Sequence, residues 1–438
     1  MEQRRKNLTQ LFIPICLETL LYMLSGMVDT LMLSSVNDQA VGAVGTANTY
    51  IGIFIIMFSV ISSGMVAVMT QNIGAGRPGV AYQARQLGLV FNAALGVIMS
   101  LFLSLGAGTI LSGVGVADAL MQPAKTYLQI VGGFCILNAL IPICSSYLRA
   151  FGFSKEPLYA SIIGNVINFC LNAFFLFVLH KGVAGVATAT VISRIINLVI
   201  VVLLGAVLVK AKQHPERESN RAVMGQIIRI GLPSACETAI YNVSMTLVIR
   251  FLNQMDAQGL NVTARSYTMQ ITNFSYCVGA ALAQANAIMT GWHIGAKEYD
   301  ACDRGTKKAA VIGVIVAVIL ETVFTLCSGW IMQLFSKDPQ MVSLVGKLLA
   351  IDIVLEIGRV TNLVYGQALK TSGDAVFPVV MGACFMILCS VGGTYLFGIR
   401  LGLLAVGAYI GMTGDECVRA VGMYLRWKSG KWKEKGLV

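Results

Sequence analysis

Long runs of apolar residues, separated by short polar segments, recur along the whole chain. Two examples are Val90 to Ser112 and Val311 to Leu334. Each is long enough to cross a bilayer as a helix, which takes about 20 residues. The pattern predicts an all-α polytopic membrane protein with twelve spans, over residues 11–34, 44–72, 86–111, 127–149, 158–179, 184–209, 226–252, 267–294, 305–333, 343–369, 376–398 and 402–426.

The composition agrees with this pattern. Of 438 residues, 56% are hydrophobic and only 12% are charged, against roughly a quarter charged in an ordinary soluble domain. A soluble globular protein is therefore excluded. The first apolar run follows Arg4, Arg5 and Lys6, as in a signal peptide, but it contains Glu18 and Asp29 and lacks a small-residue cleavage site. We interpret it as a retained first span.

The net charge of +11 does not indicate a nucleic-acid partner, because Lys and Arg lie at the ends of spans instead of gathering on one face with aromatic residues. Their excess in alternate loops places both termini in the cytoplasm by the positive-inside rule. We expect a multi-pass protein of a bacterial cytoplasmic (plasma) membrane. Its partners are the lipid bilayer and a small molecule, and it is expected to be a monomer.

Several chemistries have no sequence signal. The eleven Cys and three His form no Cys-x-x-Cys pair, so we expect neither a disulfide framework nor a metal site. A Walker A motif is missing, as are the Asp-rich and His-rich motifs of membrane enzymes and a filter-like Gly-Tyr-Gly stretch. These absences favour a transporter over an enzyme or a selective channel, with no cofactor beyond a coupling ion.

The chain also repeats itself. The polar stretch from Lys210 to Arg229 separates two halves of six spans, which we divide as residues 1–212, a cytoplasmic linker at 213–225, and residues 226–438. Pro14, Glu18, Thr19, Tyr22 and Ser25 return 219 positions later as Pro233, Glu237, Thr238, Tyr241 and Ser244. Gly74-Ala75, Leu148-Arg149 and Gly152 return 221 positions later as Gly295-Ala296, Leu369-Lys370 and Gly373. An even number of spans per repeat predicts two bundles related by a pseudo-twofold axis along the membrane normal, with a substrate path between them.

The first span carries the most informative polar residues. Glu18, Tyr22, Ser25 and Asp29 follow at steps of four, three and four residues, so they share one helical face. Acids within a span are costly and usually serve an ion or substrate path. The structural alternative is a polar helix–helix contact. The repeat has no second Asp, because Val248 stands at the position matching Asp29.

Amides and a hydroxyl follow on the fifth and sixth spans. Asn168 and Asn172 are four residues apart and therefore stack on one face, and Thr190 on the sixth span can complete a polar cluster. Such amides also join helices in membranes, which is the alternative interpretation.

In the second half, Glu237 and Tyr241 repeat the first-span pattern. On the tenth span, Glu356 and Arg359 are three residues apart and Asp352 lies one turn earlier, which predicts an internal ion pair. A structural lock and a role in binding substrate or protons are both open for this group. The same alternatives hold for Asp415, Glu416 and Arg419 on the last span.

Several motifs together resemble the multidrug and toxic compound extrusion (MATE) family. They are Leu-Phe-Ile-Pro14 with Gly26-Met-Val-Asp29-Thr30, Gln71-Asn-Ile-Gly74-Ala-Gly76, Leu148-Arg149-Ala-Phe-Gly152, and Gly-Val-Ala-Gly185-Val-Ala-Thr-Ala-Thr190. The resemblance implies a V-shaped pair of six-helix bundles that exports cationic or polyaromatic compounds in exchange for H+ or Na+. It also implies a cation site in the first bundle, built from Asp29, Asn168, Asn172 and Thr190.

Our interpretation is a secondary active antiporter that exports cationic or amphiphilic small molecules by alternating access. The second bundle offers Glu237, Tyr241, Glu356 and Arg359 as substrate or ion candidates. A flippase of a lipid-linked or amphiphilic metabolite is the alternative, and it would need a strongly cationic cavity. A sensor or scaffold is a third possibility, and it would need an added soluble domain.

Overall fold

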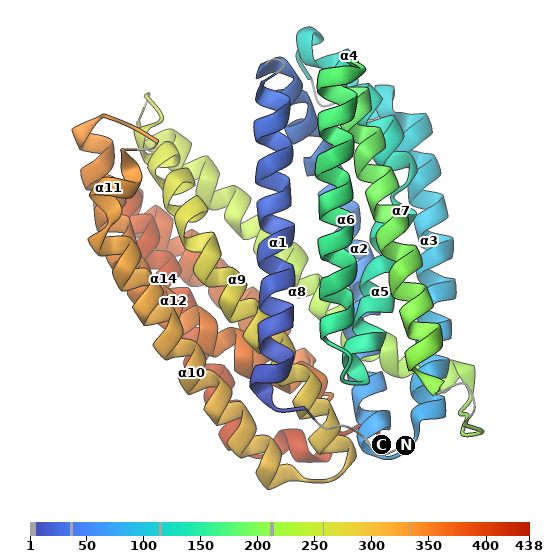
Figure 1. The fold of residues 1–438 in the computed structure, drawn as a ribbon. Helices are drawn as coiled ribbons and strands as arrows, with labels where there is room; N and C mark the ends of the chain where they lie inside the picture. Colours follow the sequence, from blue (N-terminus) through green and yellow to red (C-terminus); the bar gives the residue numbers. More distant parts are fainter. Residues whose placement is uncertain (1–5, 36–37, 114–115, 211–213, 257, 334) are drawn as a thin grey trace. The chain divides into compact units, whose positions relative to one another are not determined.

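The computed structural model describes residues 6–35, 38–113, 116–210, 214–256, 258–333 and 335–438, and in these ranges the chain is helical throughout with no strand. It divides into two compact units, Met1–Gly231 and Leu232–Val438. The helices of the first half (Figure 1) are α1 (Leu8–Ser34), α2 (Asp38–Gly74), α3 (Pro78–Gly113), α4 (Asp118–Tyr127), η1 (Leu128–Gly132), α5 (Ile136–Ala150), α6 (Lys155–Ala173), η2 (Phe174–Val178) and α7 (Gly182–Leu208). Those of the second half are α8 (Asn220–Met255), α9 (Leu260–Gly295), α10 (Tyr299–Leu326), α11 (Ser328–Met332), α12 (Pro339–Thr371), α13 (Val376–Phe385), η4 (Met386–Val391), η5 (Thr394–Arg400), α14 (Leu404–Lys428) and η6 (Lys431–Glu434).

The twelve predicted spans are confirmed as helical segments, but four of them are not single regular helices. The fourth span consists of α4, the π-helical turn η1 and α5, and it bends by 43° at the break before Ile136. Gly132 and Gly133 lie at this break, where the absence of side chains weakens the helix. The fifth and eleventh spans also end in π-helical turns, and the ninth is broken between α10 and α11.

The spans differ in how apolar they are. Seven helices are long and apolar enough to cross a membrane by composition, and the bent pair of α4 and α5 makes an eighth. The other four long helices, α8, α9, α12 and α14, are less apolar and belong mainly to the second unit. Buried Asp, Glu and Arg side chains on α12 and α14 account for part of this difference.

In the first unit, the core lies between α2, α3, α5 and α7 and contains mostly Ala, Leu and Val side chains. Asn92 on α3 holds this core together by donating to the carbonyl oxygens of Phe58 (3.3 Å) and Ala139 (3.2 Å). The predicted linker is partly helical, because α8 begins at Asn220. Two residues before α8, Glu218 forms an ion pair with Arg77, which lies between α2 and α3. Residues 211–213 of the predicted linker lie outside the described residues.

In the second unit, α12 is central and packs against α9, α10 and α14. Gly358 permits the close approach of α14. A β-carbon at Gly358 would lie 2.9 Å from the backbone nitrogen of Cys417 and 2.9 Å from the carbonyl carbon of Glu416. This contact places Glu416 beside the charged residues of α12.

The repeated loop motifs form the same helix cap in both units. Gly152 and Gly373 have positive φ values of 86° and 97°, which favour glycine. In each case the following residue donates its N–H to the carbonyl of Leu148 or Leu369 at 2.9 and 3.0 Å. This left-handed cap ends α5 and α12 alike, so the duplication seen in sequence is also present in the backbone.

We expect Gly358→Ala to destabilise the protein by about 1–3 kcal/mol, because the new methyl group must displace the backbone of α14. The matched control is Gly414→Ala, also within a long helix, where nothing lies within 4 Å of an added β-carbon. That variant should be neutral or up to about 1 kcal/mol more stable. Thermal unfolding of the purified proteins in detergent measures both, and equal midpoints would contradict the close contact.

Candidate functional site

The predicted cation site of the first unit is partly assembled. Asn172 on α6 donates from Nδ2 to Oδ1 of Asp29 on α1 at 2.6 Å. The same amide donates to Oδ1 of Asn168, one turn earlier on α6, at 3.2 Å. Asn168 and Asn172 are buried, whereas Asp29 is half-buried. The structure therefore joins three of the four residues predicted for this site.

Thr190 is buried on α7, but its hydroxyl donates to the carbonyl of Val186 in its own helix at 2.9 Å. One turn further along α7, Arg194 is an electrostatic neighbour of Asp29. Arg194 and Asp29 are also electrostatic neighbours of Tyr127 at the end of α4. Sequence reasoning missed Arg194, although a lone Arg within the apolar run of residues 184–209 was a usable signal.

The other polar residues of the first span have different environments. Glu18 forms an ion pair with Arg149 at the end of α5, with 2.5 Å between Oε2 and Nη2. Tyr22 is 69% exposed, and Ser25 is half-buried. The four residues share one helical face, as predicted, but Glu18 is engaged at the end of α5 while Asp29 contacts α6.

The second unit contains the repeat of this ion pair. Glu237 on α8 pairs with Lys370 near the end of α12 at 2.6 Å, and both side chains are about 15% exposed. Glu237 and Lys370 are the repeat partners of Glu18 and Arg149. In each unit the first helix is thereby bound to the last turn of the fourth span. Tyr241 is 37% exposed and is an electrostatic neighbour of Arg359.

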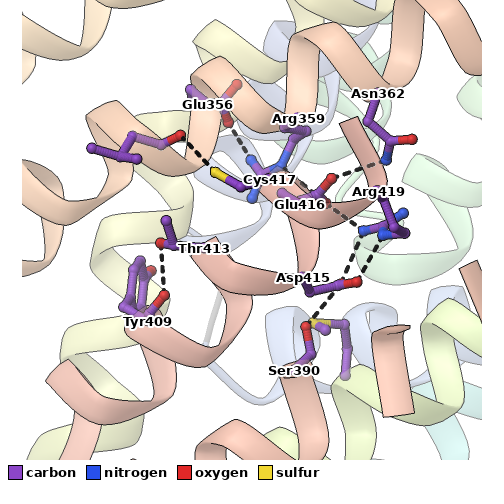
Figure 2. Close-up of polar contacts among 12 residues, drawn as sticks. Glu356, Arg359, Asn362, Ser390, Tyr409, Thr413, Asp415, Glu416, Cys417 and Arg419 are labelled. Carbon is purple, nitrogen blue, oxygen red and sulfur yellow. Dashed lines mark hydrogen bonds and ion pairs between the residues drawn. The ribbon is translucent and has the colours of Figure 1, made fainter. Parts of the chain in front are cut away.

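A second polar network joins α12 to α14 (Figure 2). Glu356 and Arg359 form the predicted ion pair, which is confirmed. Arg359 also approaches Glu416, with 3.8 Å between Nε and Oε1. Arg419 binds both acids of its own helix, Asp415 and Glu416, each at 2.8 Å.

Neutral groups complete this network. The amide of Asn362 on α12 donates to Glu416 Oε2 at 3.0 Å. The hydroxyl of Ser390, within the π-helical turn η4, donates to Asp415 Oδ2 at 2.9 Å. The carboxylates of α14 are thus held by hydrogen bonds from two other spans, which suits a fixed structural element.

A further group of acids combines two residues singled out in the sequence, Asp352 and Glu356, with one that sequence reasoning missed, Glu321. Glu321 on α10 lies beside Asp352 and Glu356 on α12, with one carboxylate oxygen from each within 4.8 Å of the others. All three side chains are buried. The expectation of no metal site considered only Cys and His, and the position of Glu321 in a long apolar run was the available signal. Three such carboxylates can hold protons or a hard cation.

Comparison with known proteins agrees with the fold and the repeats. The family model described as MatE matches residues 14–174 and 233–396. "Uncharacterized transporter YisQ" of Bacillus subtilis (strain 168) is 34% identical over 430 residues, covering 97% of this chain and 94% of that protein. "Probable multidrug resistance protein NorM" of Thermotoga maritima is 23% identical, covering 99% and 94%.

A solved structure described as the outward-facing conformation of a multidrug resistance MATE family transporter of the MOP superfamily matches with a TM-score of 0.87. Its sequence identity is 18%, and the match covers 98% of this chain and 95% of that one. The fold is thus that of a twelve-helix, two-bundle membrane transporter. The chain belongs to the MATE family.

The repeated ion pair can be tested with a double-mutant cycle. Glu237→Gln or Lys370→Gln alone should lower stability by about 1–3 kcal/mol, because each leaves the opposite charge poorly solvated. The double variant should lose less than the sum of the single losses, since no unpaired charge remains. The measurement is thermal unfolding in detergent. Additive losses would mean that the pair contributes no coupling energy.

Proposed function

We propose that this MATE-family transporter is a secondary active antiporter, which exports cationic or amphiphilic small molecules in exchange for H+ or Na+. Its halves alternate between inward and outward access. The coupling site is Asp29 with Asn168, Asn172 and Thr190. The cycle needs no cofactor beyond the coupling ion, and the working unit is a monomer in the bacterial plasma membrane with both termini in the cytoplasm.

The contact between Asp29 and Asn172 is the observation that carries this proposal. Glu18 on α1 pairs directly with the cation Arg149, whereas Asp29 on α1 accepts a hydrogen bond from the amide of Asn172, which also donates to Asn168. The carbonyl oxygen of the Asn172 amide is buried and has no hydrogen-bond partner among the described residues. A half-buried carboxylate next to an unpaired carbonyl supports a site that accepts a small cation.

Coupling follows from competition for one charge. Partial burial penalises an ionised carboxylate, so binding of H+ or Na+ at Asp29 is favoured by the surroundings. A cationic substrate favours the ionised, empty carboxylate instead. If occupancy by the ion and by the substrate stabilise different orientations of the two halves, the ion gradient drives export.

The charges of the second unit support cationic substrates less directly. Glu237 and Glu356 have cationic partners, Lys370 and Arg359, which favours structural roles for all four. Tyr241 is the most exposed of the second-unit candidates and lies in the electrostatic surroundings of Arg359. We therefore assign Tyr241 to substrate contact and the paired residues to positioning. Acids outnumber cations among the described buried side chains of the second unit, which does not favour the alternative flippase with an anionic cargo.

Asp29→Asn tests the coupling site. This change keeps the size and hydrogen bonding of the side chain but removes its charge, and a neutral amide is cheaper to bury. We expect the variant to fold but to lose at least about 90% of ion-driven export, since the carboxylate is the group that titrates or binds Na+. Export of a fluorescent organic cation from proteoliposomes is measured with separately imposed proton and sodium gradients.

Asp118→Asn is the control, because Asp118 is exposed at the start of α4 and should tolerate the same substitution. Wild-type gradient dependence in Asp29→Asn would disprove the assignment. If neither gradient drives export of the fluorescent cation by the wild-type protein, the proposal of antiport is wrong.

A further inference from the structure

The acids Glu321, Asp352 and Glu356 form a compact group in the interior of the second unit. Their exposed fractions are 0%, 2% and 0%, and one oxygen of each lies within 4.8 Å of the others. The group draws on two neighbouring helices, because Glu321 lies on α10 and the other two lie on α12. Like charges this close, and this far from water, repel strongly unless something positive lies between them.

Four of their six carboxylate oxygen atoms have no hydrogen-bond partner among the described residues. Both oxygens of Glu321, Oδ2 of Asp352 and Oε2 of Glu356 are buried without a hydrogen-bond partner among the described residues. The hydroxyl of Ser275 on α9 is also buried and faces the carboxylate of Glu321. Buried polar atoms nearly always have a partner. The four unsatisfied carboxylate oxygens and the Ser275 hydroxyl come from three helices, and together they point to a ligand that is coordinated by oxygen atoms.

The charge balance of the same region points in the same direction. The buried acids of this part of the unit are Glu321, Asp352, Glu356, Asp415 and Glu416. The cations near them are Arg265 and Arg419, which are buried, and Arg359, whose side chain is 20% exposed. Arg359 and Arg419 are bound to Glu356, Asp415 and Glu416. Even when Arg265 is counted, two negative charges have no counterpart among the described buried side chains.

We propose that Glu321, Asp352, Glu356 and Ser275 form a site for a hard metal cation, held by oxygen ligands and independent of the Asp29 site. Hard cations such as Ca2+, Mg2+ and Mn2+ take carboxylate and other oxygen ligands. A charge deficit of two matches a divalent ion, whereas Na+ would leave one negative charge uncompensated. The ion would bind α9, α10 and α12 together in the centre of the unit.

The site belongs to one half of the chain only. At the repeat offset of 221, the positions matching Glu321, Asp352 and Glu356 are Ser100, Val131 and Cys135. A group required by the fold of both bundles would be expected in both. The second unit therefore acquired these acids for a purpose of its own.

Thermal unfolding of the purified full-length chain in detergent tests the proposal. After treatment with a chelator, Ca2+, Mg2+, Mn2+, Na+ or K+ is added at constant ionic strength and pH. A divalent ion at about 100 times its Kd should raise the unfolding midpoint by roughly 3 °C or more. Elemental analysis of the washed protein should find about one divalent ion per chain.

The variants separate a site from a general salt effect. Glu321→Gln should abolish the metal-dependent shift and raise the midpoint in chelator, because it removes charge repulsion. If that variant does not fold, Ser275→Ala keeps every charge and should still reduce the shift. Asp374→Asn is the control, since Asp374 is a buried acid with its own cationic partners, Arg426 and Lys435. It should keep the full shift, as should Asp29→Asn.

Three outcomes would overturn the proposal. The first is a stability that responds to pH but to none of the metals, which would mean that the acids hold protons. The second is a response to Na+ alone, which would overturn the divalent assignment. The third is a shift of equal size in Glu321→Gln and the wild-type protein. None of them bears on antiport, because the readout is stability and not transport.

Discussion

The cost of burying a charge inside a membrane protein governs the polar interior of this molecule. An ionised group in a low-dielectric interior is tolerated only with a partner close by. Most acids within the spans of this chain have one: Glu18 has Arg149, Glu237 has Lys370, and Asp415 and Glu416 share Arg419. The exceptions are Asp29, which contacts an amide, and Glu321 and Asp352, which have no ion pair among the described residues. The same rule that explains the paired acids motivates our two proposals that ions bind at the unpaired ones.

Duplication supplied the framework, and divergence supplied the chemistry. The two units share their glycine caps and the ion pair between the first helix and the fourth span. These features fix the backbone, so either half would be weakened without them. The chemically distinct groups are not shared: Asp29 has Val248 as its counterpart, and Glu321 has Ser100. Two similar bundles with different ion chemistry suit a transporter whose halves perform unequal tasks.

Irregular helix lies next to some of the polar contacts. The π-helical turn η2 begins two residues after Asn172, and η4 contains Ser390, which donates to Asp415. The turn η1 follows Tyr127 directly. A π-helical turn inserts one residue into a helix and rotates the side chains beyond it, and such turns are frequent at functional sites. Asn172, Ser390 and Tyr127 therefore lie in or beside departures from regular α-helix, whereas the ion pairs of α12 and α14 lie on regular helices.

The sequence by itself determined every feature whose cause is local. Apolar run length defined the twelve spans, a fixed offset revealed the duplication, and a three-residue spacing on one helix predicted the pair of Glu356 and Arg359. Tertiary structure alone decided contacts between distant segments, because periodicity defines a helical face but not the neighbour that this face meets. It paired Glu18 with Arg149, left Tyr22 exposed on the same face, and brought Glu321 to Asp352 from a different span. Packing of α9, α10, α12 and α14 set those neighbours, and close contacts such as that at Gly358 depend on atoms from two helices at once.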